Sequence, residues 1–204
     1  MYIFLKIGEE VVKKIVVLSA SPRKNGNCDS IVEFAKKQYE GIDSLDVDYV
    51  NIRDLKNVKN CISCDSCKKT KKCIHKDDIA EVLNKIHESD SIAFISPIYF
   101  GYPPATIKML VDRLYAYFDP SKGFEVPKDK IKKMLVAFSF GTGPAEQYDK
   151  VAHETAFNFM VIGVNEHKTI MLGNQNDKKT FSEKVANDSE FADKIKSLFD
   201  WLAE

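Results

Sequence analysis

The stretch KIVVLSASPRKNGNC, residues 14–28, joins a strand to a helix through a polar loop. KIVVLS (14–19) is a short apolar run, which is typical of a buried strand. The loop ASPRKNGNC (20–28) follows, and the periodic segment behind it predicts a helix from about Asp29 to Tyr39. A buried strand, a polar loop and a helix in this order form the first unit of an α/β sheet.

The same alternation continues along the chain. Further strands are predicted at 45–52, 91–97, 132–140 and 161–172, and further helices at 77–89, 105–117, 145–160 and 191–202. Five strands alternating with helices predict an α/β fold in which helices cover both faces of a parallel sheet. The sequence has no internal repeat, low-complexity tract or linker, so we expect residues 1–204 to form a single domain.

Composition excludes several functional classes. The 204 residues include 30 basic and 30 acidic side chains, so no net charge favours nucleic acid or an anionic membrane. No apolar run approaches the roughly 18 residues that cross a bilayer. The first residues, MYIFLKIGEEVVKK, do not resemble a signal peptide, so we expect a cytoplasmic protein. In a reducing cytosol, clustered cysteines favour metal or redox chemistry over disulfides.

The loops that follow the first four strands carry the unusual residues. They are ASPRKNGNC, the cysteine segment CISCDSCKKTKKC (61–73), IYFGYPP (98–104) and GTGP (141–144). In an open parallel sheet, ligands bind beyond the carboxyl ends of the strands. We therefore expect all four loops to meet at one edge of the sheet.

The first loop is suited to an anion because it leads into a helix N-terminus, where backbone N–H groups are free. Ser19, Ser21, Asn25 and Asn27 supply short donors, and Arg23 adds a charged fork. Neither G-x-x-x-x-G-K-[ST] nor G-x-G-x-x-G is present, so a single phosphomonoester fits better than a triphosphate or a pyrophosphate. The alternative is an ordinary polar turn in which Asn27 caps the helix.

The third and fourth loops are suited to a planar ring. SPIYFGYPP (96–104) is stiffened by three prolines, and Gly101 permits close approach, so its N–H groups can bond the edge of a heterocycle. Its aromatic side chains either stack on the ring or fill the core or a subunit interface. Ser139, Phe140 and Gly141 begin the fourth loop, which adds two glycines where a ring would lie. A phosphate and a planar ring on such a sheet predict FMN.

The cysteine segment has the spacing of a metal site. Its ligand candidates follow the pattern C-x2-C-x2-C-x5-C at Cys61, Cys64, Cys67 and Cys73. Ferredoxin-type segments use the same close run of three cysteines for a [4Fe–4S] cluster, whereas structural zinc usually takes two C-x2-C knuckles set well apart. A [4Fe–4S] cluster is therefore favoured, and zinc or a metal-free loop are the alternatives.

Charged residues surround these cysteines. The lysines at 68, 69, 71 and 72 would favour the reduced cluster and steer an acidic donor such as ferredoxin, or they are simply solvated. His75 could ligate zinc, but it is interpreted as a surface residue. Asp77 and Asp78 are interpreted as residues of a helix start rather than as catalytic acids.

Three segments together resemble a known family. SASPRKNGNC (19–28), SPIYFGYPPATIKMLVDR (96–113) and the cysteine segment ending in KDD are similar to the NAD(P)H-dependent FMN reductase family, and within it to the iron–sulfur flavoproteins of anaerobes, over roughly residues 14–171. The resemblance implies a flavodoxin-like, doubly wound five-stranded sheet of order 2-1-3-4-5. It also implies a dimer or tetramer and one [4Fe–4S] cluster on the four cysteines.

The resemblance also assigns residues to FMN. It gives the phosphate to Ser19, Ser21, Arg23, Asn25, Asn27 and Cys28. It places against the isoalloxazine the residues Pro97, Ile98, Tyr99, Phe100 and Gly101. Two departures stand out. Family members often have Thr or Ser where this chain has Cys28, and a thiol is a weaker donor. The N-terminal extension, residues 1–13, has no counterpart, and we interpret it as an added strand or an oligomer contact.

Two functions of different class follow. The first is an FMN-dependent oxidoreductase that uses NAD(P)H or ferredoxin to reduce a small acceptor, with or without the cluster. The second is an electron carrier in which FMN and cluster pass electrons between partners with no substrate pocket. A zinc-stabilised interaction module without FMN is a third possibility. None of the four histidines has a convincing catalytic partner in the sequence, so a conventional hydrolase is not expected.

Overall fold

The computed structural model describes residues 12–119, 121, 131–173 and 180–204. Its strands form a five-stranded parallel sheet of order β2-β1-β3-β4-β5, as the resemblance implied. The strands are β1 (Lys13–Ser19), β2 (Leu45–Asn51), β3 (Ser91–Pro97), β4 (Lys132–Ser139) and β5 (Val164–Leu172). The predicted α/β class and strand order are therefore confirmed.

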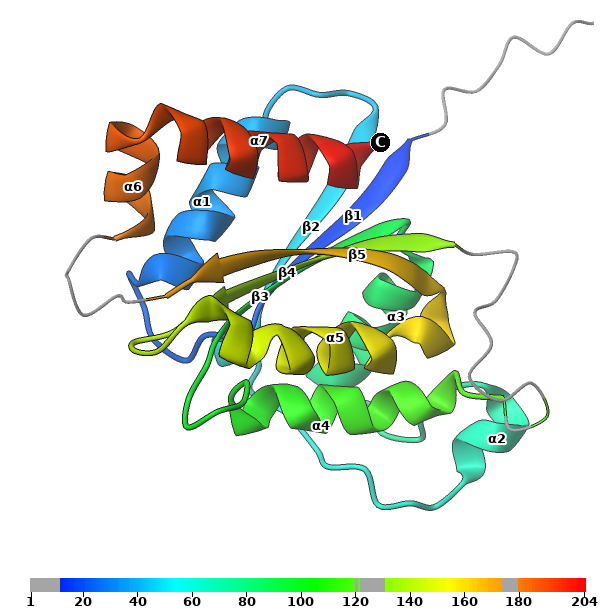
Figure 1. Cartoon of the computed structure of the whole chain (residues 1–204). Helices are drawn as coiled ribbons and strands as arrows, with labels where there is room; N and C mark the ends of the chain where they lie inside the picture. Colours follow the sequence, from blue (N-terminus) through cyan, green and yellow to red (C-terminus); the bar gives the residue numbers. More distant parts are fainter. Residues whose placement is uncertain (1–11, 120, 122–130, 174–179) are drawn as a thin grey trace, which may run out of the picture.

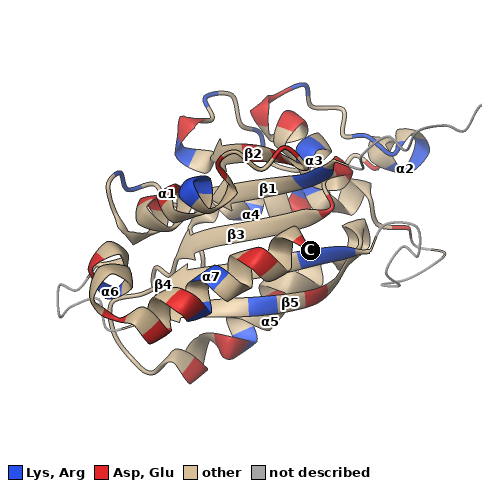
Figure 2. Ribbon diagram, turned by 90° about the horizontal axis from the view of Figure 1, so that it is seen from above, with Lys and Arg blue, Asp and Glu red and all other residues tan. Residues whose placement is uncertain are grey.

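The burial of each strand follows its place in the sheet. All seven residues of the central strand β3 are buried, whereas the edge strand β2 is exposed or half-buried along its length. β1 is buried from Ile15 to Ser19. Seen from above, the charged residues of the inner strands lie mainly at the ends where the strands begin (Figure 2). Continuous apolar runs are the pattern expected of parallel strands that helices cover on both faces.

Helices cover both faces of the sheet (Figure 1). α1 (Asn27–Tyr39), α6 (Phe181–Asn187) and α7 (Ser189–Ala203) lie on one face, and α3 (Asp78–Glu88), α4 (Ala105–Arg113) and α5 (Asp149–Asn158) lie on the other. The alternation of side chains along β1 divides the core between them. Ile15 and Val17 pack in the cluster that contains Ile31 and Phe199, and Val16 and Leu18 pack in the cluster that contains Leu110.

The structure shifts several predicted boundaries. The helix predicted at 105–117 ends at Arg113 and continues as a 3₁₀ turn, Leu114–Ala116. The helix predicted at 145–160 is preceded by a 3₁₀ turn, Ala145–Tyr148, before α5. The last strand was predicted from residue 161 and begins at Val164, because a 3₁₀ turn, Met160–Ile162, and Gly163 at φ 108° come first.

Three short helical segments were not predicted. α2 (Ser66–Thr70) lies inside the cysteine segment, a 3₁₀ turn, Ile52–Asp54, follows β2, and α6 precedes α7. α6 begins with a capping box in which Thr180 and Glu183 exchange hydrogen bonds between side chain and backbone.

The prediction for the N-terminal extension falls mainly outside the described residues, which begin at Val12. Among the described residues, no helix combines the length and the apolar character needed to cross a lipid bilayer.

Candidate functional site

The loops after β1, β3 and β4 converge on one edge of the sheet (Figure 1). Backbone bonds tie the strand ends together: Ala20 N–H donates to Ile95 O at 2.8 Å, and Ile98 N–H donates to Ser139 O at 2.9 Å. Phe140 N–H donates to Leu172 O at 3.0 Å. The predicted phosphate loop and the two predicted ring loops are therefore neighbours.

The first loop is folded by its own hydrogen bonds. Ser21 Oγ accepts from Arg23 N–H and donates to Arg23 O, both at 3.2 Å. Asn25 takes a left-handed conformation, φ 56°, and its N–H donates to the Asp29 carboxylate at 2.6 Å. Ser21 is buried, whereas Arg23 and Asn25 are exposed. The loop thus presents an exposed guanidinium at the start of α1.

Arg53 is a residue of this region that the sequence did not single out. Its Nη1 donates to Asp29 Oδ1 at 2.7 Å and to Arg23 O at 2.8 Å. It therefore neutralises the acidic group at the start of α1 and fixes the loop, which keeps the region compatible with an anion. Ser19 and Arg53 line a hollow of about 490 Å³ beside the loop, and Ser19 Oγ is buried with no hydrogen-bond partner among the described residues.

Asn27 and Cys28 lie inside α1. The alternative in which Asn27 caps the helix was wrong, because the cap position is Gly26. Asn27 instead links the strand ends to α6: its Nδ2 donates to Ser139 Oγ at 3.3 Å, and its Oδ1 accepts from Phe181 N–H at 2.9 Å. Cys28 is buried, and burial raises the pKa of its thiol to about 12. Cys28 is therefore a neutral thiol in the folded protein at neutral pH.

The loop after β3 ends in a tight turn. Tyr99 N–H donates to Tyr102 O at 2.8 Å, and Tyr102 N–H donates to Tyr99 O at 3.3 Å. Phe100 and Gly101 both have positive φ, 49° and 94°, which is the type I′ pattern. The turn holds Phe100 entirely exposed, with Tyr99 and Tyr102 exposed beside it. Ile98, before the turn, is buried. Three aromatic side chains thus stand at the edge of the sheet.

Part of the loop after β4 is buried in the hydrophobic core. Phe140 is buried against the Tyr148 ring, with centroids 4.5 Å apart, and a methyl group on Gly173 would meet the Phe140 ring at 2.5 Å. Ser139 is engaged by Asn27, and Gly141 is exposed. Gly141 is therefore the exposed member of the three residues predicted here.

The cysteine segment does not join this edge, so the expectation that all four loops meet was wrong. Lys68 Nζ donates to the backbone oxygens of Tyr115 and Phe118, which follow the C-terminal end of α4. α4 begins near the ring loop and runs back toward the starts of the strands, so α2 and the ring loops lie at opposite ends of it (Figure 1). The nine residues of α4 alone span about 13 Å.

A buried ion pair joins the last residue of α4 to the residue that caps α3, just after the cysteine segment. Arg113 Nη1 lies 2.7 Å from Asp77 Oδ2, and both side chains are fully buried. Asp77 also accepts from Lys59 N–H at 2.9 Å and caps α3 through Ala80 N–H at 3.1 Å. Asp78 accepts from Lys56 and Asn57 N–H groups, at 2.7 and 3.1 Å. The interpretation of both aspartates as helix-start residues is confirmed.

The four cysteines face a common space. They line one narrow hollow of about 20 Å³ whose other members include Asp65, His75 and Tyr115. Cys61 and Cys64 are exposed. Hydrogen bonds from the backbone and side chain of Ser66 lower the pKa of Cys64, while burial raises that of Cys67. Among the described residues, no three His, Cys, Asp or Glu side chains form a group that could hold a metal ion.

The donor set still fits an iron–sulfur cube in kind. A cube binds each thiolate to a different iron atom, so its four sulfurs stand farther apart than the ligands of one ion. The narrow hollow holds about one water molecule, and Cys61 and Cys64 lie exposed on it. Buried polar atoms lie close by without a partner among the described residues: His75 Nε2, Arg113 Nε and Arg113 Nη2.

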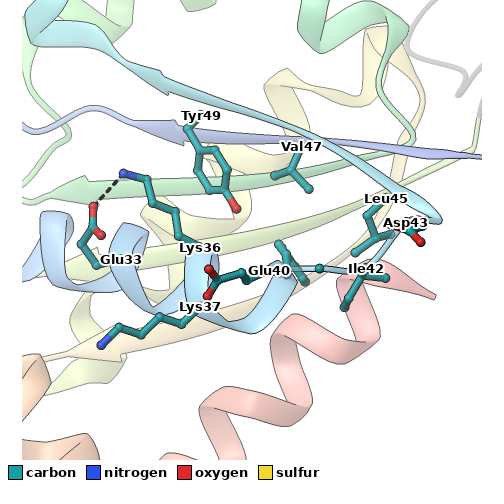
Figure 3. Close-up of a pocket in the computed structure, with 11 residues that line it drawn as sticks. Glu33, Lys36, Lys37, Glu40, Ile42, Asp43, Leu45, Val47 and Tyr49 are labelled. Carbon is teal, nitrogen blue, oxygen red and sulfur yellow. Dashed lines mark hydrogen bonds and ion pairs between the residues drawn. The ribbon is translucent and has the colours of Figure 1, made fainter.

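A larger hollow lies beyond the phosphate loop, along α1. It has a volume of about 690 Å³ and lies between α1 and the edge strand β2 (Figure 3). Lys36 pairs with Glu33 at 2.7 Å on its rim, and the Tyr49 ring faces it. None of the sequence motifs falls among the residues that line it. It adjoins the hollow beside Ser19, with which it shares Glu33, Lys36 and Tyr49.

Known proteins resemble this chain in sequence and in fold. The NADPH-dependent FMN reductase family matches residues 13–177. An iron–sulfur flavoprotein of Methanocaldococcus jannaschii is 39% identical over 102 residues, which make up 49% of this chain and 51% of that protein. An iron–sulfur flavoprotein of Methanosarcina thermophila is 28% identical over 160 residues, 76% of this chain and 79% of that protein. The first of these matches thus spans about half the length of the relative.

Solved structures share the fold at low identity. An NADH:FMN oxidoreductase in its apo form has a TM-score of 0.63 and 15% identity, covering 94% of this chain and 88% of that one. The azoreductase of Bacillus anthracis has a TM-score of 0.62 and 17% identity, covering 94% and 97%. The family match covers most of the chain, and the sheet order and the loop after β1 agree with it. This chain belongs to the NADPH-dependent FMN reductase family.

Proposed function

We propose that this chain is an FMN-dependent oxidoreductase that also carries an iron–sulfur cluster. The observation that supports FMN most directly is the meeting of two loops at one sheet edge. The loop after β1 presents an exposed guanidinium at a helix start, and the loop after β3 presents a rigid aromatic turn. A phosphate group and a planar ring need these two environments at neighbouring strand ends.

The residues have separate tasks in binding FMN. Ser21 and Arg23, with the N–H groups at the start of α1, hold the phosphate, and Arg53 keeps Asp29 from repelling it. The turn at Phe100 and Gly101 places backbone N–H groups and aromatic faces beside the ring. When bound, FMN accepts a hydride or single electrons. The protein itself orients the ring and excludes water, and no acid–base group of the chain is required for that step.

The proposed cluster is a [4Fe–4S] centre on Cys61, Cys64, Cys67 and Cys73. Its support is the common hollow that the four cysteines line and the names of the relatives, which are iron–sulfur flavoproteins. When bound, such a cluster exchanges one electron at a time. Lys69, Lys71 and Lys72 are exposed in α2 and just after it, where Figure 2 colours much of the ribbon blue, and these charges favour an acidic electron-transfer partner such as ferredoxin.

The two proposed centres lie at opposite ends of α4 in one chain. NAD(P)H would donate at the FMN edge, and a one-electron partner would act at the cysteine end. The exposed aromatics Tyr99, Phe100 and Tyr102 favour a homodimer or homotetramer that covers the ring edge. Sedimentation of the purified protein tests the oligomer, and a monomer at micromolar concentration would contradict it.

Anaerobic purification followed by quantitation of FMN, iron and sulfide tests the cofactors. We expect one FMN, four irons and four sulfides per chain. If the protein contains flavin but no iron, the cluster is contradicted and the protein is an FMN reductase without one. A protein that contains zinc but no flavin would contradict the whole proposal.

Steady-state oxidation of NADH and NADPH separates the enzyme from a pure electron carrier. An oxidoreductase turns over with at least one nucleotide and a small acceptor such as a quinone. An FMN-loaded protein that shows no turnover with either nucleotide, yet exchanges electrons with reduced ferredoxin, would establish the carrier instead.

A further inference from the structure

Arg113 is a buried cation for which the sequence predicted no separate role. It is 1% exposed and lies at the last position of α4, next to the residues that flank the cysteine segment. Nη1 bonds Asp77 Oδ2 at 2.7 Å and Lys59 O at 3.3 Å. Lys59 precedes the first cysteine by two residues, and Asp77 follows the last by four. Arg113 therefore joins the two ends of the segment that carries the four thiols.

The Arg113 guanidinium has more N–H donors than its bonds to Asp77 and Lys59 use. Nε and Nη2 are buried and have no hydrogen-bond partner of normal geometry among the described residues. Both Asp77 oxygens are already engaged, by Lys59 N–H, Ala80 N–H and Arg113 itself. Burying N–H donors without acceptors is unfavourable, so the arrangement favours an acceptor that the described contacts do not supply.

Cys73 is the side chain placed to supply that acceptor. The Arg113 guanidinium interacts with Cys73 as well as with Asp77, and both partners raise its pKa against the effect of burial. Cys73 also lines the hollow shared by the other three cysteines. A metal-bound thiolate is a stronger acceptor than a thiol, so loading the site would satisfy donors that remain unused otherwise.

We propose that Arg113 is the positioning residue of the four-cysteine site: its free N–H groups hold the Cys73 sulfur in the metal-bound form, and its charge favours the reduced form of the centre. This inference rests on the proposed cluster. No covalent step is involved, since Arg113 keeps its protons and donates hydrogen bonds to sulfur. Asp77 holds the guanidinium in place from the other side.

Two variants with opposite charge changes test the role. Arg113→Met removes the donors and the positive charge, and Asp77→Asn removes the negative charge but leaves the guanidinium beside Cys73. Both break the same buried ion pair. In EPR-monitored redox titrations of anaerobically loaded protein, we expect Arg113→Met to shift the reduction equilibrium about tenfold toward the oxidised form, or about 59 mV for one electron. We expect Asp77→Asn to shift it the other way or not at all.

A conservative variant covers the case in which Arg113→Met does not fold. Arg113→Lys keeps an ion pair with Asp77 but has no planar fork, so we expect near wild-type folding and a smaller shift in the same direction as Arg113→Met. In ¹⁵N NMR of labelled arginine, the Nε–H signal of Arg113 should move between metal-free and loaded wild-type protein.

Several outcomes would overturn the inference. One is an unchanged potential in a loaded Arg113 variant, and another is an equal shift in the same direction for Arg113→Met and Asp77→Asn, which loosening of the loop would produce. An Nε–H signal that loading does not move is a third. Wild-type protein with FMN but with neither iron nor sulfide would instead overturn the cluster itself, and this inference with it.

Discussion

The ammonium group of Lys132 is buried against the backbone carbonyl of Ser89, and its Nζ also donates to His87 O at 2.9 Å. Lys132 is the first residue of β4, and the two carbonyls belong to the C-terminal end of α3. A buried lysine therefore satisfies the end of a neighbouring helix, where carbonyl groups lack intrahelical partners. A cation at this end also interacts favourably with the helix dipole.

Lys132→Met should destabilise the fold. It preserves much of the apolar stem and removes the donor, so two buried carbonyls lose their charged partner, at a cost of about 2 kcal/mol. Equilibrium unfolding in urea measures the difference. The matched control is Lys108→Met on the exposed face of α4, where an ion pair with Asp112 is lost and the change should stay within about 0.5 kcal/mol. Equal losses in the two variants would contradict the role of Lys132.

Replacing Asp77 should lower the free energy of unfolding more than replacing any exposed carboxylate. Asp77→Ala leaves Arg113 charged and buried without its partner and removes the cap of α3, so we expect a loss of about 3–5 kcal/mol in the free energy of unfolding. Asp77→Asn keeps a side chain that can cap α3 and should be about 1 kcal/mol less damaging. Urea unfolding of both variants tests this order. A loss below 1 kcal/mol for Asp77→Ala would contradict the ion pair.

The same carboxylate predicts a pH dependence. Burial alone would raise the pKa of Asp77, but hydrogen bonds from Arg113 and Ala80 and the Arg113 charge outweigh it and lower that pKa. In the unfolded chain this carboxyl has the ordinary aspartate pKa of about 3.9. The folded state therefore binds fewer protons than the unfolded chain, and the free energy of unfolding rises with pH in this range. The stability difference between wild type and Asp77→Asn should be full above pH 5 and shrink as the pH falls toward 2.5. A constant difference across that window would refute the depressed pKa.

The sequence predicted the sheet because the information is local. Apolar runs such as SIAFISP (91–97) are strands that the helices bury on both faces, and continuous runs identify them without knowledge of the partners. α6 was missed because it has only seven residues, although Thr180 and Glu183 have the capping-box spacing that signals a helix start. The meeting of the loops after β1 and β3 at one sheet edge was likewise predictable from their positions in the sequence, and the roles of their residues in binding FMN stay predictions.

The place of the cysteine segment was not predictable in the same way. It follows β2 in sequence, but contacts with residues far along the chain decide where it lies: Lys68 with Tyr115, and Asp77 with Arg113. In sequence, Arg113 is simply a basic residue in the last turn of a helix, a position that usually faces water. The burial of Arg113 depends on the tertiary fold. Neither its ion pair with Asp77 nor the separation of the cysteine segment from the ring loops could therefore be inferred from the spacing of residues in the sequence.

Arg23 should discriminate FMN from riboflavin. Its side chain is exposed at the phosphate loop, so Arg23→Gln removes a charged donor without disturbing the core. We expect FMN to bind about tenfold more weakly, as the loss of one charge-assisted hydrogen bond predicts. Binding of riboflavin, which lacks the phosphate, should be unchanged in the same flavin-fluorescence titration. The control is Lys24→Gln at the neighbouring exposed position. Equal weakening of both flavins would indicate that Arg23 acts on the loop rather than on the phosphate.

Cys28 should be the thiol that native protein protects. With a pKa near 12, raised by burial, roughly one Cys28 in ten thousand is ionised at pH 8. Cys64 is exposed, and hydrogen bonds from Ser66 lower its pKa, so it should react first. Brief iodoacetamide treatment of metal-free protein, followed by peptide mass spectrometry, should label Cys64 and leave Cys28 unmodified until urea unfolds the chain. Labelling of Cys28 at a rate comparable to Cys64 in native protein would show that the start of α1 opens, and a phosphate cradle built there would not be preformed.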